Sequence, residues 1–327
     1  MNLLREGDLI IMKKKFIGFI FLLLLTVPLL SACDEALDIT LDILDSINTE
    51  ESSETEFNKD KESKVTAEAV EGLKVHFIDV GQGDAILVQT EDSNMLIDAG
   101  DWNGDEVVPY LESQGVKEVD ILQGTHEHAD HIGQMDKVIE NFEVSEVWMP
   151  GNTHTSQVYE RVLTGIDEND IDYVEPRAGE TYDLDSLEIE ILSPSELTGD
   201  YNDDSIVMKT TYDEVSFMFT GDVEQTGEQK MLDNDMDLDA NILKAGHHGS
   251  STSNTDGFVK AVSPEVAIMS YGEDNKYNHP NGSILDRFNK YGIEMYGTQA
   301  HGNIVITTDG ESFNVQTEKD GTVKKGD

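Results

Sequence analysis

The stretch T-H-E-H-A-D-H, residues 125–131, decides the fold that we expect for this chain. It places three histidines and an aspartate within six residues. Imidazole and carboxylate groups are the ligands that zinc or manganese accepts. A lone histidine usually packs in a protein core, but this density of ligands predicts a metal site.

The neighbours of this motif place it on a loop. Successive residues of a helix are rotated by about 100°, so a helix cannot aim all four side chains at one point. Residues 119–122 are mostly apolar and favour a strand that ends at Gly124, and residues 132–141 have the mixed polarity of a helix. The motif is therefore predicted on a strand-to-helix loop, a common position for catalytic groups.

Short strands and helices follow one another through residues 71–320. Strands are predicted at residues 75–78, 85–88, 95–97, 147–149, 187–192, 206–211, 215–220 and 303–308, and helices at 107–114, 157–165, 225–232 and 283–290. Strand pairs in each half predict an α/β fold of the αββα sandwich type, with two mixed sheets face to face and helices outside. A single doubly wound sheet would need a more regular alternation of strand and helix.

Polar residues with ligand character follow three other predicted strands. These are Asp98 in D-A-G, Asp222 in T-G-D, and His247 with His248 in G-H-H-G-S. Each one alone could be a surface turn. Their recurrence at successive strand ends indicates one site, because such ends converge when strands pack into a sandwich.

In this order, H-x-H-x-D-H, T-G-D and G-H-H-G-S resemble the metallo-β-lactamase-fold hydrolases. Residues 77–85 (F-I-D-V-G-Q-G-D-A), 244–253 and 278–280 (N-H-P) resemble, more particularly, the soluble domain of ComEC-type competence proteins and their stand-alone relatives. The resemblance spans roughly residues 73–317. It implies two divalent ions, zinc or manganese, about 3.5–4 Å apart, which lower the pKa of a shared water toward about 7.

The family roles assign the metal ligands in two groups. One ion is assigned to His126 and His128, the other to Asp130, His131 and His247, and Asp222 lies between the ions. Neighbouring residues of a strand point in opposite directions, so only one of His247 and His248 should face the ions. The sequence leaves open which one does.

The chain departs from the broad family at one ligand. Many members supply a third histidine to the first ion shortly before the T-G-D strand, whereas residues 199–205 read G-D-Y-N-D-D-S. Asn202 or a water could stand there, which favours a harder ion such as manganese. His154 is a further alternative, although capping a helix is the commoner role for such a residue.

Three residues are expected to act on the substrate, and several others to support the site. Catalytic roles are assigned to Asp130, to His279 as proton donor to the leaving group, and to Lys244 as a partner of Asp222. A turn histidine beside proline is the ordinary alternative for His279. The hydroxyls of Ser250, Ser251 and Thr252 suit a phosphate or a helix cap. A supporting role, in contact with the metal-binding side chains and not with the metal ions, is assigned to Asp79, Asp98, Asn202 and His248.

The first 70 residues have a different composition. Residues 12–15 are basic, residues 16–30 are apolar, and L-S-A-C ends at Cys33, the single cysteine. This layout is typical of a secretory signal peptide, and its ending resembles the bacterial lipobox, in which the cysteine is lipidated. The apolar run of about 15 residues is shorter than the roughly 20 that span a bilayer, which disfavours a plain membrane anchor.

The chain is therefore divided into four parts. Residues 1–32 are upstream residues and signal peptide, 33–70 an acidic flexible tether, 71–320 the hydrolase domain and 321–327 a tail. We expect a protein that is anchored to the cell membrane through Cys33 and faces the outside. The oligomeric state is left open.

The charge limits the function. There are 67 acidic and 22 basic residues, a net charge of -45, which repels polyanions at long range. The leading hypothesis is a phosphodiesterase with ComEC-like nuclease activity on DNA, although few lysines and arginines are present to contact phosphates. The alternatives are cleavage of envelope phosphodiesters, such as teichoic acid or phosphocholine, and a non-catalytic surface module that binds metal or DNA.

Overall fold

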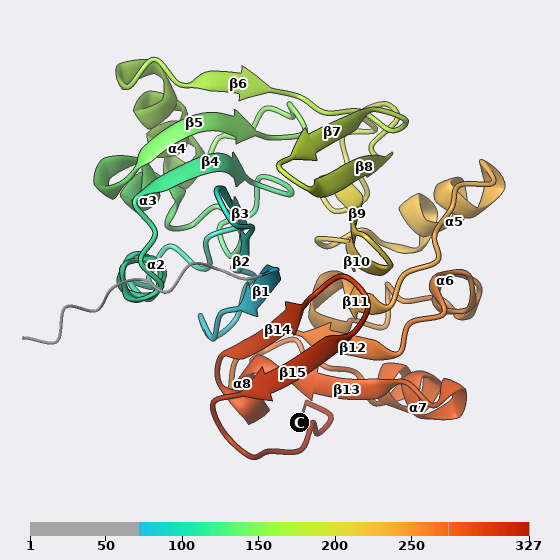
Figure 1. Ribbon diagram of the computed structural model, residues 1–327. Coiled ribbons are helices and arrows are strands. Elements are labelled where there is room, and N and C mark those ends of the chain that lie inside the picture. Colours follow the sequence, from blue (N-terminus) through green and yellow to red (C-terminus); the bar gives the residue numbers. More distant parts are fainter. Residues whose placement is uncertain (1–71, 274, 327) are drawn as a thin grey trace, which may run out of the picture. The chain divides into compact units, whose positions relative to one another are not determined.

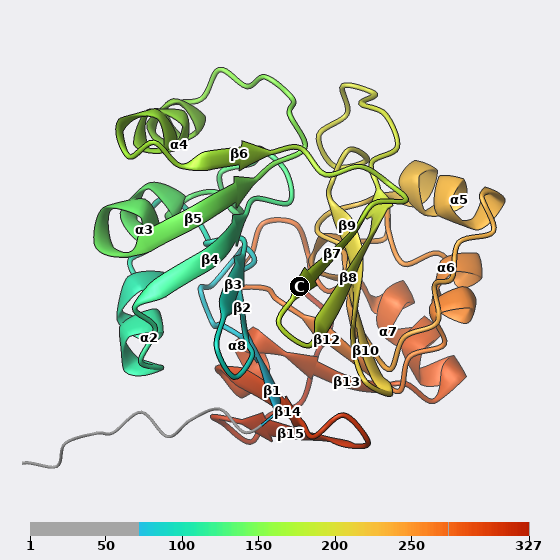
Figure 2. The same cartoon turned by 45° about the horizontal axis from the view of Figure 1, so that its top comes forward.

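Two mixed β-sheets lie face to face in the computed structural model, which describes residues 72–273 and 275–326. Figure 2 shows helices on the outer side of each sheet, with the two sheets between them. The predicted αββα sandwich is confirmed.

The first sheet contains the strands that lead to the histidine-rich loop. Its eight strands have the order β15-β14-β1-β2-β3-β4-β5-β6. Their bounds are β1 Leu73–Phe77, β2 Ile86–Gln89, β3 Asn94–Ile97, β4 Glu118–Gln123, β5 Glu143–Trp148, β6 Asp172–Val174, β14 Ile304–Thr308 and β15 Phe313–Thr317. The strands β1, β2 and β3 pair antiparallel, whereas β3 to β6 run parallel. The parallel strands are joined through α2 Val107–Ser113, α3 Met135–Asn141 and α4 Gln157–Glu168.

The second sheet has seven strands in the order β13-β12-β11-β10-β9-β8-β7. Their bounds are β7 Thr181–Leu184, β8 Leu187–Ser193, β9 Val207–Tyr212, β10 Val215–Phe219, β11 Ile242–Lys244, β12 Val266–Met269 and β13 Glu294–Gly297. Its helices are α5 Gln225–Asp233, α6 Asp256–Val262 and α7 Gly282–Tyr291. The short α8, Thr298–His301, then leads back to β14 in the first sheet, as Figure 1 shows.

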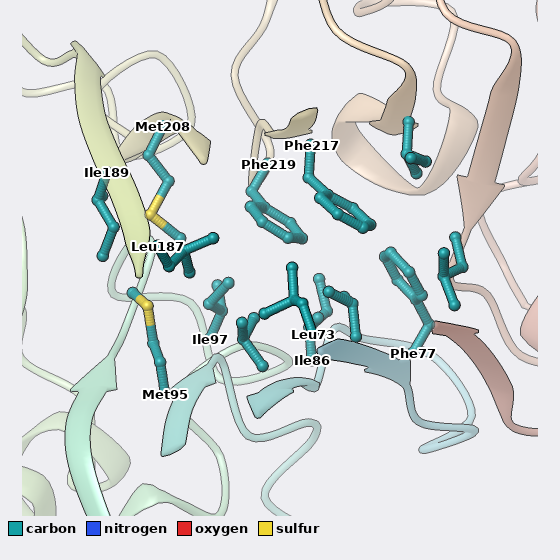
Figure 3. Close-up of a cluster of buried hydrophobic side chains, with 14 of the residues drawn as sticks. Leu73, Phe77, Ile86, Met95, Ile97, Leu187, Ile189, Met208, Phe217 and Phe219 are labelled. Atoms are coloured by element: carbon teal, nitrogen blue, oxygen red, sulfur yellow. The ribbon is translucent and has the colours of Figure 1, made fainter. Parts of the chain in front are cut away.

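Alternating side chains of the strands form the core between the sheets. Leu73, Val75 and Phe77 of β1 are fully buried and belong to one apolar cluster with Leu187, Phe217 and Phe219 of the second sheet. Figure 3 shows the side chains of Leu73 and Phe77 meeting those of Leu187, Phe217 and Phe219 across the interface. Side chains on the opposite face of the first sheet, such as Leu87 of β2 and Leu96 of β3, pack in a separate cluster with the residues of α2, α3 and α4. Each such side chain stabilises the fold by about 1.5–3 kcal/mol.

The structure differs from the sequence prediction mainly in the small strands. The strands β6, β7, β13 and β15 were not predicted, because they are short and carry exposed polar residues. The short, fully buried β12 was also not predicted. The helix α3 begins at Met135 rather than at residue 132, because the backbone N–H groups of His131 and Ile132 are used in a turn that returns to the His128 carbonyl. In the predicted tail, the N–H of Gly326 donates to the Pro280 carbonyl at 2.9 Å.

Several predictions fall on residues that the structure does not describe. The signal peptide at residues 1–32, the tether at 33–70 and the lipidated Cys33 lie outside the described residues. Within residues 72–273 and 275–326, no helix has the length and apolar character needed to cross a membrane.

The core predicts a clear difference between two leucines. Leu187 is fully buried between the sheets, whereas Leu197 is 38% exposed. We expect Leu187→Ala to lower the free energy of unfolding by about 2–5 kcal/mol, because it removes buried methyl groups and leaves a cavity. Leu197→Ala, the matched control, should change it by less than about 1 kcal/mol. Urea denaturation measures both, and equal losses would contradict the sandwich core.

Candidate metal centre

The histidine-rich loop lies between β4 and α3, as predicted, and it is fixed by one buried carboxylate. The Asp98 carboxylate, which follows β3, accepts hydrogen bonds from the N–H and the hydroxyl of Thr125 at 2.7 and 2.8 Å. It also lies 2.7 Å from His131 Nδ1. His126 and His131 are fully buried. The loop therefore turns both imidazoles toward the interior of the sandwich.

Asp222 is the central residue of the site. It follows β10 of the second sheet, and its Oδ2 lies 3.2 Å from His131 Nε2, 3.5 Å from His248 Nε2, 3.6 Å from His247 Nε2 and 3.9 Å from His126 Nε2. This one oxygen thus faces imidazoles from both sheets, as expected of a group between two ions.

Four overlapping groups of side chains could hold a metal ion within the described residues. They are His126–His131–Asp222, Asp130–His131–His248, Asp84–Asp222–His248 and Asp84–Asp98–His131. Two of these groups contain His248 and none contains His247, whereas the family roles assigned His247. His247 is partly exposed, and its Nδ1 faces the Glu224 carboxylate at 3.2 Å. The geometry favours His248 as the ligand beside Asp130.

The backbone explains this difference. Both histidines lie in the short 3-10 turn η1, Gly246–Gly249, with φ of 51° at His247 and 55° at His248. The strand β11 ends before them, at Lys244. The assumption that they alternate on a strand was therefore wrong, since the left-handed turn directs the two rings independently of strand geometry.

The other half of the site is more open. His128 Nδ1 lies 2.9 Å from His126 Nε2, so the two nitrogens converge. Asn202 and His128 line one cavity beside the cluster, and the Asn202 Nδ2 donates to Glu224 at 3.3 Å. His154 accepts a hydrogen bond from the Ser156 N–H at the start of α4 and belongs to none of the four groups. Asn202 rather than His154 is therefore placed to complete this half.

The donor atoms fit divalent ions. His131 Nε2, His248 Nε2, Asp222 Oδ1 and Asn202 Oδ1 are buried and have no hydrogen-bond partner in the described part of the chain. Leaving such an atom unsatisfied costs about 1–3 kcal/mol. Several of them around Asp222 form a donor set of nitrogen and oxygen that zinc or manganese accepts.

The electrostatics of the cluster also suit a cation. Burial alone would raise the pKa of Asp222, but the imidazoles of His131 and His248 hold it well below its usual range. Burial would lower the pKa of His131, but the carboxylates of Asp222 and Asp98 raise it well above its usual range. Asp222 thus stays negatively charged, and a metal ion can replace the protonated His131 as its counter-charge.

A cavity of about 310 Å³ opens onto this cluster. Its lining includes Gln82, His128, Asp130, Asn202, Tyr277 and His279. Among the residues that the structure describes, no lysine or arginine lines it. His279 is mostly buried, its ring centroid lies 5.4 Å from that of His247, and its Nδ1 has no hydrogen-bond partner in the described chain. This places His279 where a substrate would bind.

Two predicted residues lie elsewhere. The Lys244 ammonium is buried and contacts Asp84 Oδ2 at 2.7 Å, instead of the expected Asp222, and Lys244 does not line the cavity. The Asp79 N–H donates to Asn303 and its carboxylate lies 3.6 Å from Lys319, so it belongs to none of the metal groups.

The hydroxyl run after η1 makes contacts within the protein. The Ser250 and Thr252 hydroxyls lie 2.9 Å apart, and Thr252 also donates to Glu224 at 2.9 Å. Ser251 is exposed and, like the other two, is not among the cavity residues. The cap of α6 is Thr255, whose side chain accepts from the Phe258 N–H.

Asp84 is the site residue that the sequence analysis did not select. It lay within the quoted G-Q-G-D segment, and only the fold shows that it is buried beside His248 and Lys244. Gly83 has φ of 130°, and a Cβ there would collide with the Asp130 carbonyl. The glycine therefore allows the two loops to approach each other.

The sandwich fold and a buried cluster of histidines and aspartates define a class of metal-dependent hydrolases. The family model described as the Metallo-beta-lactamase superfamily matches residues 78–273, and the chain belongs to this superfamily. The crystal structure of CmlA, a diiron beta-hydroxylase from Streptomyces venezuelae, superposes with a TM-score of 0.52 at 15% identity. It covers 73% of this chain and 54% of that chain, and it supports the fold alone.

Two curated relatives confirm the resemblance to ComEC-type proteins. ComE operon protein 3 of Bacillus subtilis is 30% identical over 251 residues, which are 71% of this chain and 32% of that protein. Competence protein ComA of Neisseria gonorrhoeae is 31% identical over 230 residues, 68% of this chain and 30% of that protein. The chain thus spans about a third of the length of these relatives.

The two neighbouring histidines should differ in metal binding. We expect His248→Ala to weaken the binding of Zn²⁺ or Mn²⁺ by at least the roughly 10–100-fold that loss of an outer-shell partner costs. His247→Ala should have a smaller effect, because His247 is partly exposed and faces Glu224. Isothermal titration of metal into chelator-treated protein compares them. A larger loss for His247→Ala would restore the assignment made from the sequence.

Proposed function

We propose that this chain is a metal-dependent phosphodiesterase that hydrolyses DNA. The observation that carries the proposal is the convergence of His131, His248 and Asp222 on one buried point beside the cavity. Bound divalent ions would supply Lewis acidity and an activated water. The protein's own part is to hold these ions and to orient the substrate against them.

Each residue then has a defined role. Asp130, His131 and His248 would hold one ion and His126 and His128 the other, and Asp222 would be available to both. The Asn202 amide oxygen completes the weaker half, where no third histidine is present. His279 lines the cavity and is assigned to substrate contact, and it acts there as a neutral ring, because burial and the neighbouring His248 lower its pKa to about 4.

The charge of the centre suits a phosphodiester. Its carboxylates are the buried Asp84, Asp98 and Asp222 and the partly exposed Asp130, and its ammonium is Lys244. Two divalent cations would bring this set from a formal charge of about -3 to about +1. A phosphodiester carries one negative charge and would offset it. A neutral ester or β-lactam would leave the positive charge unbalanced.

DNA is the substrate that the relatives suggest. One relative is named a competence protein and another, from Haemophilus influenzae, is named Recombination protein 2. Both names refer to processes that act on DNA. We extend this to the present chain as part of the proposal.

The test is direct hydrolysis with a matched variant. The purified protein with Mn²⁺ or Zn²⁺ should cleave single- or double-stranded DNA, most readily where salt screens the acidic surface. Asp130→Ala should lose metal and at least about 100-fold in rate, while Asp183→Ala, an exposed aspartate of β7, should retain both. Intact DNA at every salt concentration would exclude the nuclease. Full hydrolysis by Asp130→Ala would exclude the assigned site.

A second candidate is hydrolysis of phosphodiesters of the cell envelope, such as teichoic acid or phosphocholine. It is favoured by the absence of lysine and arginine among the described cavity residues, since DNA binding normally uses such side chains on the phosphates. Turnover of bis(4-nitrophenyl) phosphate without any cleavage of DNA would support this candidate over the nuclease.

We also propose that the protein is anchored to the outer face of the cell membrane through lipid on Cys33. The support is the basic, apolar and L-S-A-C order of residues 12–33. Metabolic labelling with palmitate in a bacterial host should mark the wild-type chain and not Cys33→Ser. Equal labelling of both, or none of either, would contradict the anchor.

A further inference from the structure

A buried ion pair joins the two sheets beneath the metal centre. Asp84 follows the turn after β1 in the first sheet, and Lys244 ends β11 in the second. Lys244 Nζ lies 2.7 Å from Asp84 Oδ2, and each residue is only 1% exposed. Neither residue lines the cavity, so neither contacts a substrate bound there.

Asp84 contacts residues of the cluster that come from both sheets. Its backbone N–H donates to the Asp130 carbonyl at 3.2 Å, and its carbonyl accepts from the Gly100 N–H at 2.8 Å. Its Oδ1 lies 3.5 Å from His248 Nδ1. One residue of the first sheet thus contacts the Asp130 loop and the histidine that the second sheet supplies.

The contact to His248 resembles the usual support of a metal-binding histidine. Such a histidine donates its second ring N–H to a carboxylate or a carbonyl, which fixes the tautomer and the ring orientation. His248 Nδ1 faces the Ser270 carbonyl at 3.0 Å and Asp84 at 3.5 Å, so Nε2 is left toward Asp130 and Asp222. His131 is supported in the same way by Asp98.

The two supporting carboxylates are held differently. Asp98 is fixed by the Thr125 N–H and hydroxyl, which are neutral and belong to the histidine-rich loop itself. Asp84 is fixed by the charge of Lys244, which comes from the opposite sheet. Buried ion pairs are often no more stabilising than apolar residues of similar size. A gain in folding stability therefore does not by itself explain why two charged residues are buried at this position.

We propose that Lys244 is a positioning residue of the metal centre. Through Asp84, which packs against the His248 ring beside the Ser270 carbonyl, it fixes the orientation of His248 and keeps the Asp130 loop beside it. It thereby sets the metal affinity of the half formed by Asp130, His131 and His248. This inference rests on the metal site of the proposed function, and it is independent of the substrate.

A double-mutant cycle separates positioning from structural support. The variants are Lys244→Met, Asp84→Ala and the two combined, with methionine chosen because its flexible side chain fills irregular space. Lys209→Met is the matched control, because Lys209 pairs with the exposed Asp237 at 2.8 Å, away from the centre. Two quantities are measured: the stability of the metal-free protein to urea, and the affinity for Mn²⁺ or Zn²⁺.

The two quantities should respond differently. Lys244→Met should be destabilised, because it leaves a buried carboxylate unpaired, and should bind metal about 10–100-fold more weakly. The combined variant should recover much of the stability, since no unpaired charge remains, but not the affinity. Lys209→Met should match the wild type in both. A combined variant with wild-type affinity would overturn the proposal, even if Lys244→Met itself fails to fold.

Ring-nitrogen NMR of His248 gives an independent readout. With metal bound, the wild type should show one set of His248 ring signals, and the combined variant should show exchange between several ring orientations. One unchanged set of His248 ring signals would also overturn the proposal. If the wild type binds metal but cleaves no phosphodiester, the proposed function fails while this inference stands.

Discussion

The structure depends on keeping charged carboxylates buried where the two sheets meet. Asp84, Asp98 and Asp222 are at most 2% exposed. A buried ion without a partner costs several kcal/mol, so each of these carboxylates needs a positive or hydrogen-bonding partner nearby. Lys244 forms an ion pair with Asp84, Thr125 donates two hydrogen bonds to Asp98, and imidazoles from both sheets lie close to Asp222. Divalent ions bound at the centre would complete this set of counter-charges.

The apolar sandwich brings these charges together. Strands such as β1 bury side chains between the sheets, while neighbouring residues of β2 and β3 pack against the helices. The loops after β4, β10 and β11 then meet at one edge, where Asp222 Oδ2 lies 3.2 Å from His131 Nε2 and 3.5 Å from His248 Nε2. The first sheet supplies Asp130 and His131, and the second supplies Asp222 and His248. Three of the four candidate metal groups combine residues of both sheets.

The distribution of charge connects this centre to its chemistry. The chain is strongly acidic, and the described cavity lining has no cationic side chain. Attraction for an anionic group therefore has to come from ions held at the centre rather than from the protein surface. Screening of the surface by salt would help a long polyanion to approach, while a small phosphodiester would need less help.

The sequence by itself determined the fold class and most of the candidate metal site. T-H-E-H-A-D-H and Asp222 could be recognised because ligand density and positions after strands are local features. The choice of His248 over His247 needed the tertiary structure, because a left-handed turn replaces the expected strand. The pairing of Lys244 with Asp84 also needed it. These residues lie far apart in the chain, and they meet only because the two sheets close over them, which no local pattern encodes.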